Sequence, residues 1–198
     1  MKKIMFSDRY GLTKAVLTGQ KTMTRRILNE KMLACANDYV QKVHGTGHDL
    51  LDYLLEHSLF KVGEIVAVVQ AYKDCVNEIL VNWGHKTDIG TQVFKMSKGW
   101  DNKMFVRAVL MPHKIRITNV RVERLQDISD EDCFLEGIER VYYGDEEWFK
   151  AYYAKDGCKC APTPKEAFAA LIDKISGRGT WESNPWVFVY DFELLKEG

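Results

Sequence analysis

The chain has 198 residues, of which 46% are hydrophobic and 28% are charged. This is ordinary globular composition, which excludes a disordered tail or a collagen-like repeat, and no apolar run approaches the roughly 20 residues of a membrane helix. The 28 basic and 28 acidic residues cancel, which excludes a uniformly basic protein that coats nucleic acid.

The first elements that the pattern predicts are a short strand over residues 3–6 and a helix that Ser7 or Asp8 caps and that runs to about Thr18. Gly19 suits the left-handed residue that ends such a helix. Residues 20–26 then leave the helix end as a polar, basic segment.

Further along, the pattern predicts a helix over residues 49–60, a buried strand over 64–72 and an excursion with several glycines over 73–102. Strands are expected over 104–110 and 114–125. The apolar alternation of the second of these changes phase, which indicates a β-bulge near Thr118 and Asn119.

Two strong helix starts follow, at Ser129 and at Thr163. The first helix is short and ends at Glu136, before Gly137. Another helix is expected over residues 145–153, and a final strand over 187–195. This mixed order of helices and strands favours an α+β domain or a small barrel decorated by helices.

The charges are unevenly distributed along the chain. Residues 1–31 hold eight basic and two acidic residues, residues 103–124 hold six and one, and residues 125–148 hold one and nine. This segregation permits a local anion-binding face on a neutral protein. The alternative is a set of solvated faces that neutralise one another.

The most informative segment is residues 21–26, with the sequence KTMTRR. Three cations and two hydroxyls packed this densely can hold a phosphate or a carbonyl oxygen. If Lys21 is desolvated, its ammonium loses a proton more easily and can activate a neighbouring hydroxyl. The alternative is a solvent-exposed basic loop, because short clusters of Lys and Arg are common.

Residues 19–26, GQKTMTRR, resemble the G-x-K-T-x-T-x-R signature of the ASCH family. The likeness to phage- and prophage-associated ASCH proteins continues, in the same order, at residues 4–7, 61–66, 117–137 and 181–190, the last reading WESNPWVFVY. The resemblance implies one α+β domain over residues 1–198, built on a PUA-like β-barrel. Helical insertions would then occupy about 29–60, 73–103 and 139–170.

The resemblance also implies that RNA or a modified nucleoside binds in a cleft near residues 21–26. The ligand-binding residues would be Thr22, Arg25, Arg26 and Trp181. A tryptophan can stack on a base, although Trp186, beside a strand, is more typical of a core residue.

One ASCH branch is an amidohydrolase of N4-acetylcytidine, and its catalytic residues fall on Lys21, Thr24 and Glu136. Thr24 would be the nucleophile and Lys21 the base, while Glu136 would orient the lysine or carry a proton. A binding module is therefore the first hypothesis and this hydrolase the second. A third is a phage accessory protein whose insertions bind a host protein.

The cysteines are five in number and none forms a CxxC pair. Because the N-terminal residues also lack the apolar core of a signal peptide, we expect reduced thiols in the cytoplasm. Cys158 and Cys160, even with His44 and His48, do not match the spacing of a zinc site. The sequence therefore predicts no metal and no other cofactor.

Overall fold

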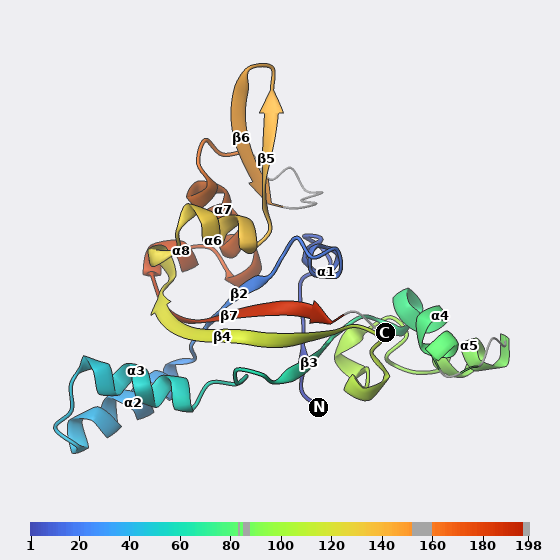
Figure 1. Cartoon of the computed structure of the whole chain (residues 1–198), viewed down its shortest axis with the longest axis horizontal. Helices are drawn as coiled ribbons and strands as arrows, with labels where there is room; N and C mark the ends of the chain where they lie inside the picture. The colour runs from blue at the N-terminus through green and yellow to red at the C-terminus, as the bar shows by residue number, and fades with distance from the viewer. Residues whose placement is uncertain (83, 85–87, 152–159, 196–198) are drawn as a thin grey trace.

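The computed structural model describes residues 1–82, 84, 88–151 and 160–195, and its centre is a mixed five-stranded sheet (Figure 1). The strand order is β1-β3-β4-β7-β2, with β1 parallel to β3 and the other pairs antiparallel. The strands are β1 (Lys3–Ile4), β2 (Met23–Ile27), β3 (Ile65–Val68), β4 (Lys114–Arg124) and β7 (Trp186–Leu195). The chain is thus an α+β protein, as predicted. Within the described residues the sheet does not close into a barrel, because β1 and β2 are its two edges.

Four helices lie close to the sheet. They are α1 (Leu12–Leu17), α6 (Asp130–Leu135), α7 (Pro164–Ser176) and α8 (Thr180–Ser183). Figure 1 shows α6, α7 and α8 clustered on one side of the long β4 and β7 strands. The buried stripe of α7, which includes Phe168, Leu171 and Ile172, joins the main hydrophobic core, as its periodicity predicts.

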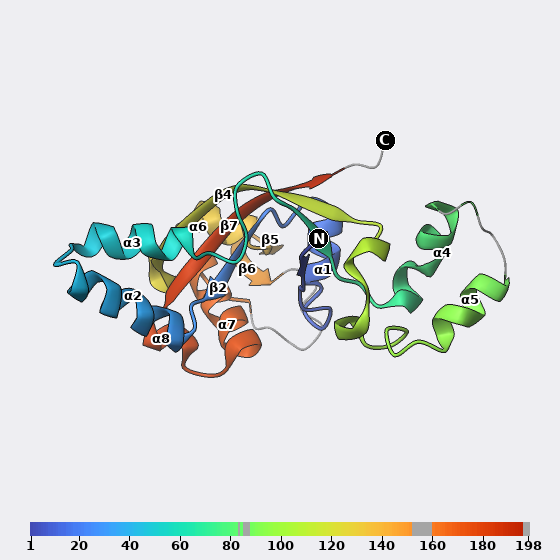
Figure 2. The ribbon, with the colours of Figure 1, turned by 90° about the horizontal axis from the view of Figure 1, so that it is seen from below.

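Three excursions leave this centre in different directions. At opposite ends of the molecule lie a helical hairpin, α2 (Glu30–Lys42) and α3 (Gly47–Glu56), and a lobe of α4 (Tyr72–Asn82) and α5 (Asp88–Lys95) (Figure 2). The third is a two-stranded hairpin of β5 (Ile138–Tyr143) and β6 (Glu146–Ala151), which projects beyond α6 and α7 (Figure 1). They overlap the segments 29–60, 73–103 and 139–170, whereas α7, which also begins in the last of these, packs in the main core.

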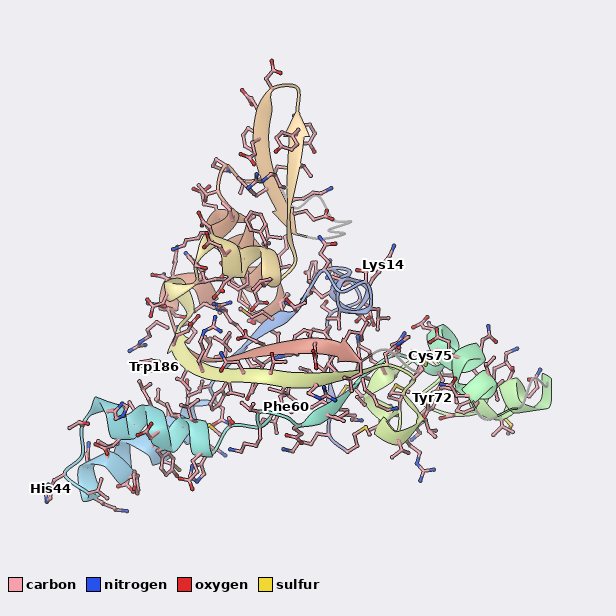
Figure 3. The ribbon with its side chains drawn as sticks, in the orientation of Figure 1. Lys14, His44, Phe60, Tyr72, Cys75 and Trp186 are labelled. Carbon is pink, nitrogen blue, oxygen red and sulfur yellow. The ribbon has the colours of Figure 1, made fainter. Side chains whose placement is uncertain are left out.

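The α4–α5 lobe has a hydrophobic core separate from that of the sheet. Buried Tyr72, Cys75, Ile79, Phe94 and Met111 belong to this second cluster. Figure 3 places Tyr72 and Cys75 in the lobe, away from β2 and its surroundings. Among the described residues, no helix has the length and apolar character needed to cross a membrane.

The bulge expected near Thr118 is confirmed. The pairing of β4 with β7 shifts register between Ile117 and Asn119. Before the shift Ile115 and Ile117 are fully buried. Because one extra residue reverses the alternation, Val120 and Val122 continue the same face of the sheet, opposite Tyr190 and Phe188.

Two of the predicted elements are wrong, and the first helix starts later than predicted. The first helix begins after Gly11 (φ 68°), not after Ser7 or Asp8, because Asp8 instead accepts a hydrogen bond from the Thr13 hydroxyl at 2.5 Å. In place of a helix from residue 145, β6 pairs back on β5 through a turn at Gly144 (φ 64°).

Residues 104–110, expected as a strand, form two 3₁₀ turns, η1 (Lys103–Phe105) and η2 (Ala108–Leu110). Only Val106 of this stretch is deeply buried, in the core of the α4–α5 lobe, while Met104, Phe105 and Val109 are mostly exposed. The backbone N–H of Arg107 donates to the Tyr72 hydroxyl at 3.0 Å. Ala108 and Leu110 also pack against this core, so the run is apolar because it covers the lobe and not because it joins the sheet.

Candidate functional site

Residues 21–26 do not form the solvent-exposed basic loop that the sequence left open as the alternative. Met23 to Ile27 form β2, which pairs with β7 at the edge of the sheet. The side chains of Lys21, Thr24 and Arg25 are buried, with 2%, 5% and 6% of their residue surfaces exposed. Burying charged groups is costly unless they are paired, so the partners of these cations define the site.

Lys21 is held between the ends of two helices. Its backbone N–H donates to the Ala15 carbonyl in α1, and the next N–H, of Thr22, donates to the Leu135 carbonyl in α6. Gly19, left-handed as predicted with φ 75°, ends α1 and turns the chain toward β2. These bonds fix the start of β2 against the end of α6.

At that end of α6, Lys21 meets Glu136. The Lys21 Nζ donates to the Glu136 Oε2 at 2.5 Å and to the Glu136 backbone carbonyl at 2.7 Å. Both side chains are almost fully buried. An ammonium has three N–H donors, so one donor of Lys21 is left without an acceptor among the described residues.

Local sequence explains how Glu136 reaches this position. The Ser129 hydroxyl caps α6 by accepting from the Asp132 N–H at 3.0 Å, and the helix ends at Glu136, as the pattern predicts. Gly137 then adopts φ 101°, which a side-chain-bearing residue rarely takes. The helix therefore stops with the Glu136 side chain and carbonyl both facing Lys21.

Arg25 connects this pair to a wider ion network. Its Nη1 donates to Glu136 Oε1 at 3.3 Å, and its Nη2 donates to Glu123 Oε1 and Asp132 Oδ2, each at 2.6 Å. Arg121 contacts Glu123 and Asp132 as well and also binds Asp191. Glu136 is thus held from one side by Lys21 and from the other by Arg25.

Strand register explains why these charges meet. Residues that lie directly opposite each other on neighbouring strands share a face of the sheet. Arg25, Val189 and Arg121 form one such row across β2, β7 and β4. This face, which we call the ion face, is also the one that α6 approaches, because Asp132 contacts both arginines.

Glu123, Asp132 and Arg121 belong to this site although the sequence did not predict them there. The signal available was the alternation of Arg121 and Glu123 on a strand next to an acidic helix start. Alternation alone, however, does not reveal which strand carries the residues opposite.

The network perturbs the pKa of each cation. Burial lowers the pKa of Lys21 from its ordinary value, against the opposing effect of Glu136. Burial also acts to lower the pKa of Arg25, but the carboxylates of Glu136, Asp132 and Glu123 outweigh it and raise that pKa. Lys21 is therefore the cation here that gives up a proton most readily.

Thr24 and Arg26 lie on the opposite face of β2. Their cross-strand partners on β7 are Tyr190 and Phe188, so we call this the ring face. Arg26 Nη2 donates to the Met5 carbonyl, just after β1, at 2.6 Å, while its buried Nε has no hydrogen-bond partner among the described residues. The guanidinium thus joins the two open edges of the sheet.

A pocket of about 260 Å³ lies where these edges approach each other. Lys21, Thr24, Arg25, Arg26 and Glu136 all line it. Its remaining wall is largely apolar and comes from the segment after β1, from α1, from the end of β2 and from α7: Met5, Phe6, Ser7, Leu12, Ile27, Phe168, Leu171, Ile172, Ile175 and Ser176. The three residues expected to be catalytic are therefore brought together.

Two of the residues expected to bind ligand lie outside this pocket lining. Thr22 is half-buried and precedes β2. Trp181 lies behind the α7 wall, with its ring edge-on to Phe168 at a centroid distance of 6.2 Å. Trp186 packs against the main core, with the Arg124 guanidinium 4.4 Å from its ring centroid.

Of the residues weighed for a metal site, His44 lies at the tip of the α2–α3 hairpin (Figure 3), and Cys158 lies outside the described residues. Within the described part of the chain, no three His, Cys, Asp or Glu side chains gather as metal ligands. Cys35, Cys75, Cys133 and Cys160 are free thiols, and burial raises the pKa of Cys133, beside the ion network, to about 12.

A scan against models of protein families, a search of curated proteins and a search of solved structures each find no match.

Proposed function

We propose that this chain binds a modified nucleoside in the pocket beside β2 and hydrolyses an amide on its base, as in N4-acetylcytidine. The observation that carries the proposal is that Thr24 lines the same pocket as the buried Lys21–Glu136 ion pair. Threonine is a weak nucleophile that needs a neighbouring base. Lys21, with its lowered pKa, is suited to that role.

The charges around the pocket favour a neutral ligand group over a phosphate. Three cations, Lys21, Arg25 and Arg121, are paired with four carboxylates: Glu123, Asp132, Glu136 and Asp191. A phosphate bound to Lys21 or Arg25 would have to displace one of these carboxylates, which would leave a buried charge unpaired. The pocket volume lies near the lower end of small-molecule sites, which span about 300–1,000 Å³.

In the proposed reaction, Lys21 passes a proton to Glu136 along their hydrogen bond and becomes a neutral amine. Lys21 then takes the proton of the Thr24 hydroxyl as its oxygen attacks the acyl carbonyl. The tetrahedral oxyanion is stabilised by the Arg26 guanidinium. Collapse breaks the C–N bond, and the base leaves as its free amine after it receives the proton from Lys21.

The acyl group is then an ester on Thr24. Water attacks this ester with Lys21 again as the base, which releases the carboxylic acid and restores the threonine hydroxyl. Glu136 and Arg25 keep the lysine in place through both halves of the reaction. Their buried contacts are fixed before any ligand arrives, so the charged groups need no rearrangement.

The proposal includes a relation to the ASCH family and its PUA-like barrel. Two features support it: the signature residues Lys21 and Thr24 face one pocket, and Arg26 links the open sheet edges through Met5. The α2–α3 hairpin, the α4–α5 lobe and the β5–β6 hairpin would then be additions to that barrel.

The test is incubation of the purified protein with N4-acetylcytidine, followed by chromatography for cytidine and acetate. Wild type should release both products in equal amounts. Lys21→Arg should be inactive, because arginine keeps the charge but does not give up a proton near neutral pH. Tight binding of the nucleoside without turnover would reject the hydrolase and leave a binding module.

Binding of long RNA at this pocket is less favoured by the same charges. RNA affinity that depends on phosphate contacts falls steeply with salt, by about 0.7 in log–log slope for each contact with a single strand. We expect little such affinity, because most cations here are already paired. Strong RNA retention with a steep salt slope would restore the RNA-binding hypothesis.

A further inference from the structure

A second pocket, of about 280 Å³, lies directly beside the first. Arg26 and Ile27 line both pockets. The other lining residues are Leu28, Asn29, Met32, His57, Leu59, Phe188 and Tyr190. The α2–α3 hairpin and the segment that follows it thus supply one wall, and the ring face of the sheet supplies the other.

We propose that this second pocket binds the neighbouring base of a short oligonucleotide whose acylated cytidine occupies the first pocket. This inference rests on the proposed function and narrows its substrate from a free nucleoside to one in a dinucleotide or slightly longer strand. Three features of the pocket carry it: its rings, its hydrogen-bond donors and its place beside Arg26.

The rings suit a planar base. Phe188 and Tyr190 are buried on the ring face, directly opposite Arg26 and Thr24 on β2. The Phe60 ring, in the same core, packs edge-on to the Tyr190 ring at a centroid distance of 5.2 Å. Stacking of bases on aromatic side chains tolerates any base sequence, so this pocket would accept different neighbours.

The rim of the pocket is apolar and open to solvent. Ile27 and Leu59 are 41% and 61% exposed. The His57 ring, also on this rim, stacks on the Tyr53 ring with 4.1 Å between their centroids. Tyr53 in turn stacks on Tyr39 of the same hairpin at 4.8 Å. A bound base would cover the rim and meet the start of this aromatic row.

Two donors are available to recognise the edge of a base. The Asn29 side-chain oxygen is occupied by the cap of α2, where it accepts from the Met32 N–H at 2.7 Å. Its NH₂ group therefore remains as a donor. The buried Nε of Arg26 has no acceptor among the described residues, and leaving such a donor unsatisfied is costly.

Arg26 also explains how one phosphate is tolerated here. Unlike Lys21 and Arg25, it pairs with no carboxylate in the described part of the chain. It lies at the junction of the two pockets, where the phosphate between two nucleosides would lie. The acidic α3, with Asp49, Asp52 and Glu56, disfavours a long strand across the hairpin.

The test is equilibrium binding of N4-acetylcytidine and of a dinucleoside monophosphate that contains it, measured in the Thr24→Ala protein so that neither is hydrolysed. We expect the dinucleotide to bind at least about tenfold more tightly, in line with one added stacked base. Leu59→Glu places a carboxylate on the rim, and it should abolish this preference while nucleoside affinity stays unchanged. The matched control is Val62→Glu, at an equally exposed residue outside the pocket, which should keep the preference.

Equal affinity for the two ligands, or a preference that survives Leu59→Glu, would overturn the second subsite and leave the proposed function standing. Loss of binding of both ligands by the Thr24→Ala protein would overturn both proposals. If N4-benzoylcytidine binds as tightly as the dinucleotide and loses this advantage in Leu59→Glu, the pocket accepts the acyl group and not a second base.

Discussion

The cations at the two ends of β2 have different kinds of partner. At the Lys21–Arg25 end, each cation is buried against carboxylates from β4 and α6. At the Arg26–Asn29 end, the neighbours are rings and aliphatic side chains, and the guanidinium contacts a backbone carbonyl. One short basic motif therefore contains cations with two different physical roles.

The difference shows what a cluster of lysines and arginines does in this protein. Lys21 and Arg25 cannot bind a phosphate without breaking an ion pair. In this structure they hold the Glu136 carboxylate in place. Arg26 remains as the group that can contact a charged or polar ligand. The following predictions separate these roles, beginning with the largest expected effect.

Thr24→Ala should lower turnover of N4-acetylcytidine by at least about 10⁴-fold, because the nucleophile is lost while binding contacts remain. The measurement is product release at saturating nucleoside. Thr22→Ala is the matched control: this threonine is two residues away, half-buried and outside the pocket lining. Equal activity in the two variants would remove Thr24 from the mechanism.

Glu136→Ala should lower the free energy of unfolding by about 3–5 kcal/mol. It leaves Lys21 buried without its carboxylate, and removing one member of a buried pair costs about this much. Denaturant titration measures the change. The matched control is Glu139→Ala. The Glu139 carboxylate is nearby, accepts a hydrogen bond from the Gln20 side chain and is less buried, so its loss should lower the free energy of unfolding by under about 1 kcal/mol. Similar losses in both variants would show that the buried pair does not stabilise the fold.

Much of this fold follows from local sequence signals. The caps at Ser129 and Thr163, the left-handed Gly19 and the bulge near Thr118 each depend on a few neighbouring residues. The failures depend on packing and strand pairing, which the pattern of a single segment does not show. Residues 104–110 are apolar because they cover the α4–α5 lobe, and residues 146–151 became a strand because β5 was there to pair with.

The site was predictable in its residue types but not in its arrangement. The motif at 19–26 identified Lys21 and Thr24, and the capping pattern located Glu136 at a helix end. The burial of Arg25 could not be predicted, because it depends on the register of β2 on β7 and on the position of α6. Trp181 was expected at the ligand because tryptophans stack on bases, whereas its actual neighbour is Phe168.

The lowered pKa of Lys21 predicts a pH dependence of stability. Between that lowered pKa and the usual value of 10.5, the unfolded chain holds the proton on this lysine more often than the folded chain. Stability must then rise with pH in this window, by at most about 1.4 kcal/mol per pH unit. The difference in unfolding free energy between wild type and Lys21→Met should accordingly shift in favour of wild type between pH 7 and pH 10. A constant difference would mean that Lys21 keeps its ordinary pKa.

The smallest effect is expected at Trp181, one layer behind the pocket. Trp181→Phe keeps an aromatic ring against Phe168 and leaves the backbone contacts of Trp181 with Gln126 and Asp173 in place. Stability should fall by about 1 kcal/mol through lost packing, while nucleoside affinity changes by less than about twofold.

Phe168→Leu is the comparison for this variant, because Phe168 itself lines the pocket and lies 6.0 Å from the Arg25 guanidinium. It removes a ring from the wall and should weaken nucleoside binding by about tenfold, as expected for the loss of one aromatic contact with a base. Titration of both variants with N4-acetylcytidine gives the two affinities. If Trp181→Phe weakened binding more than Phe168→Leu, the ligand would contact the α8 side of Phe168, and the pocket beside β2 would not be the nucleoside site.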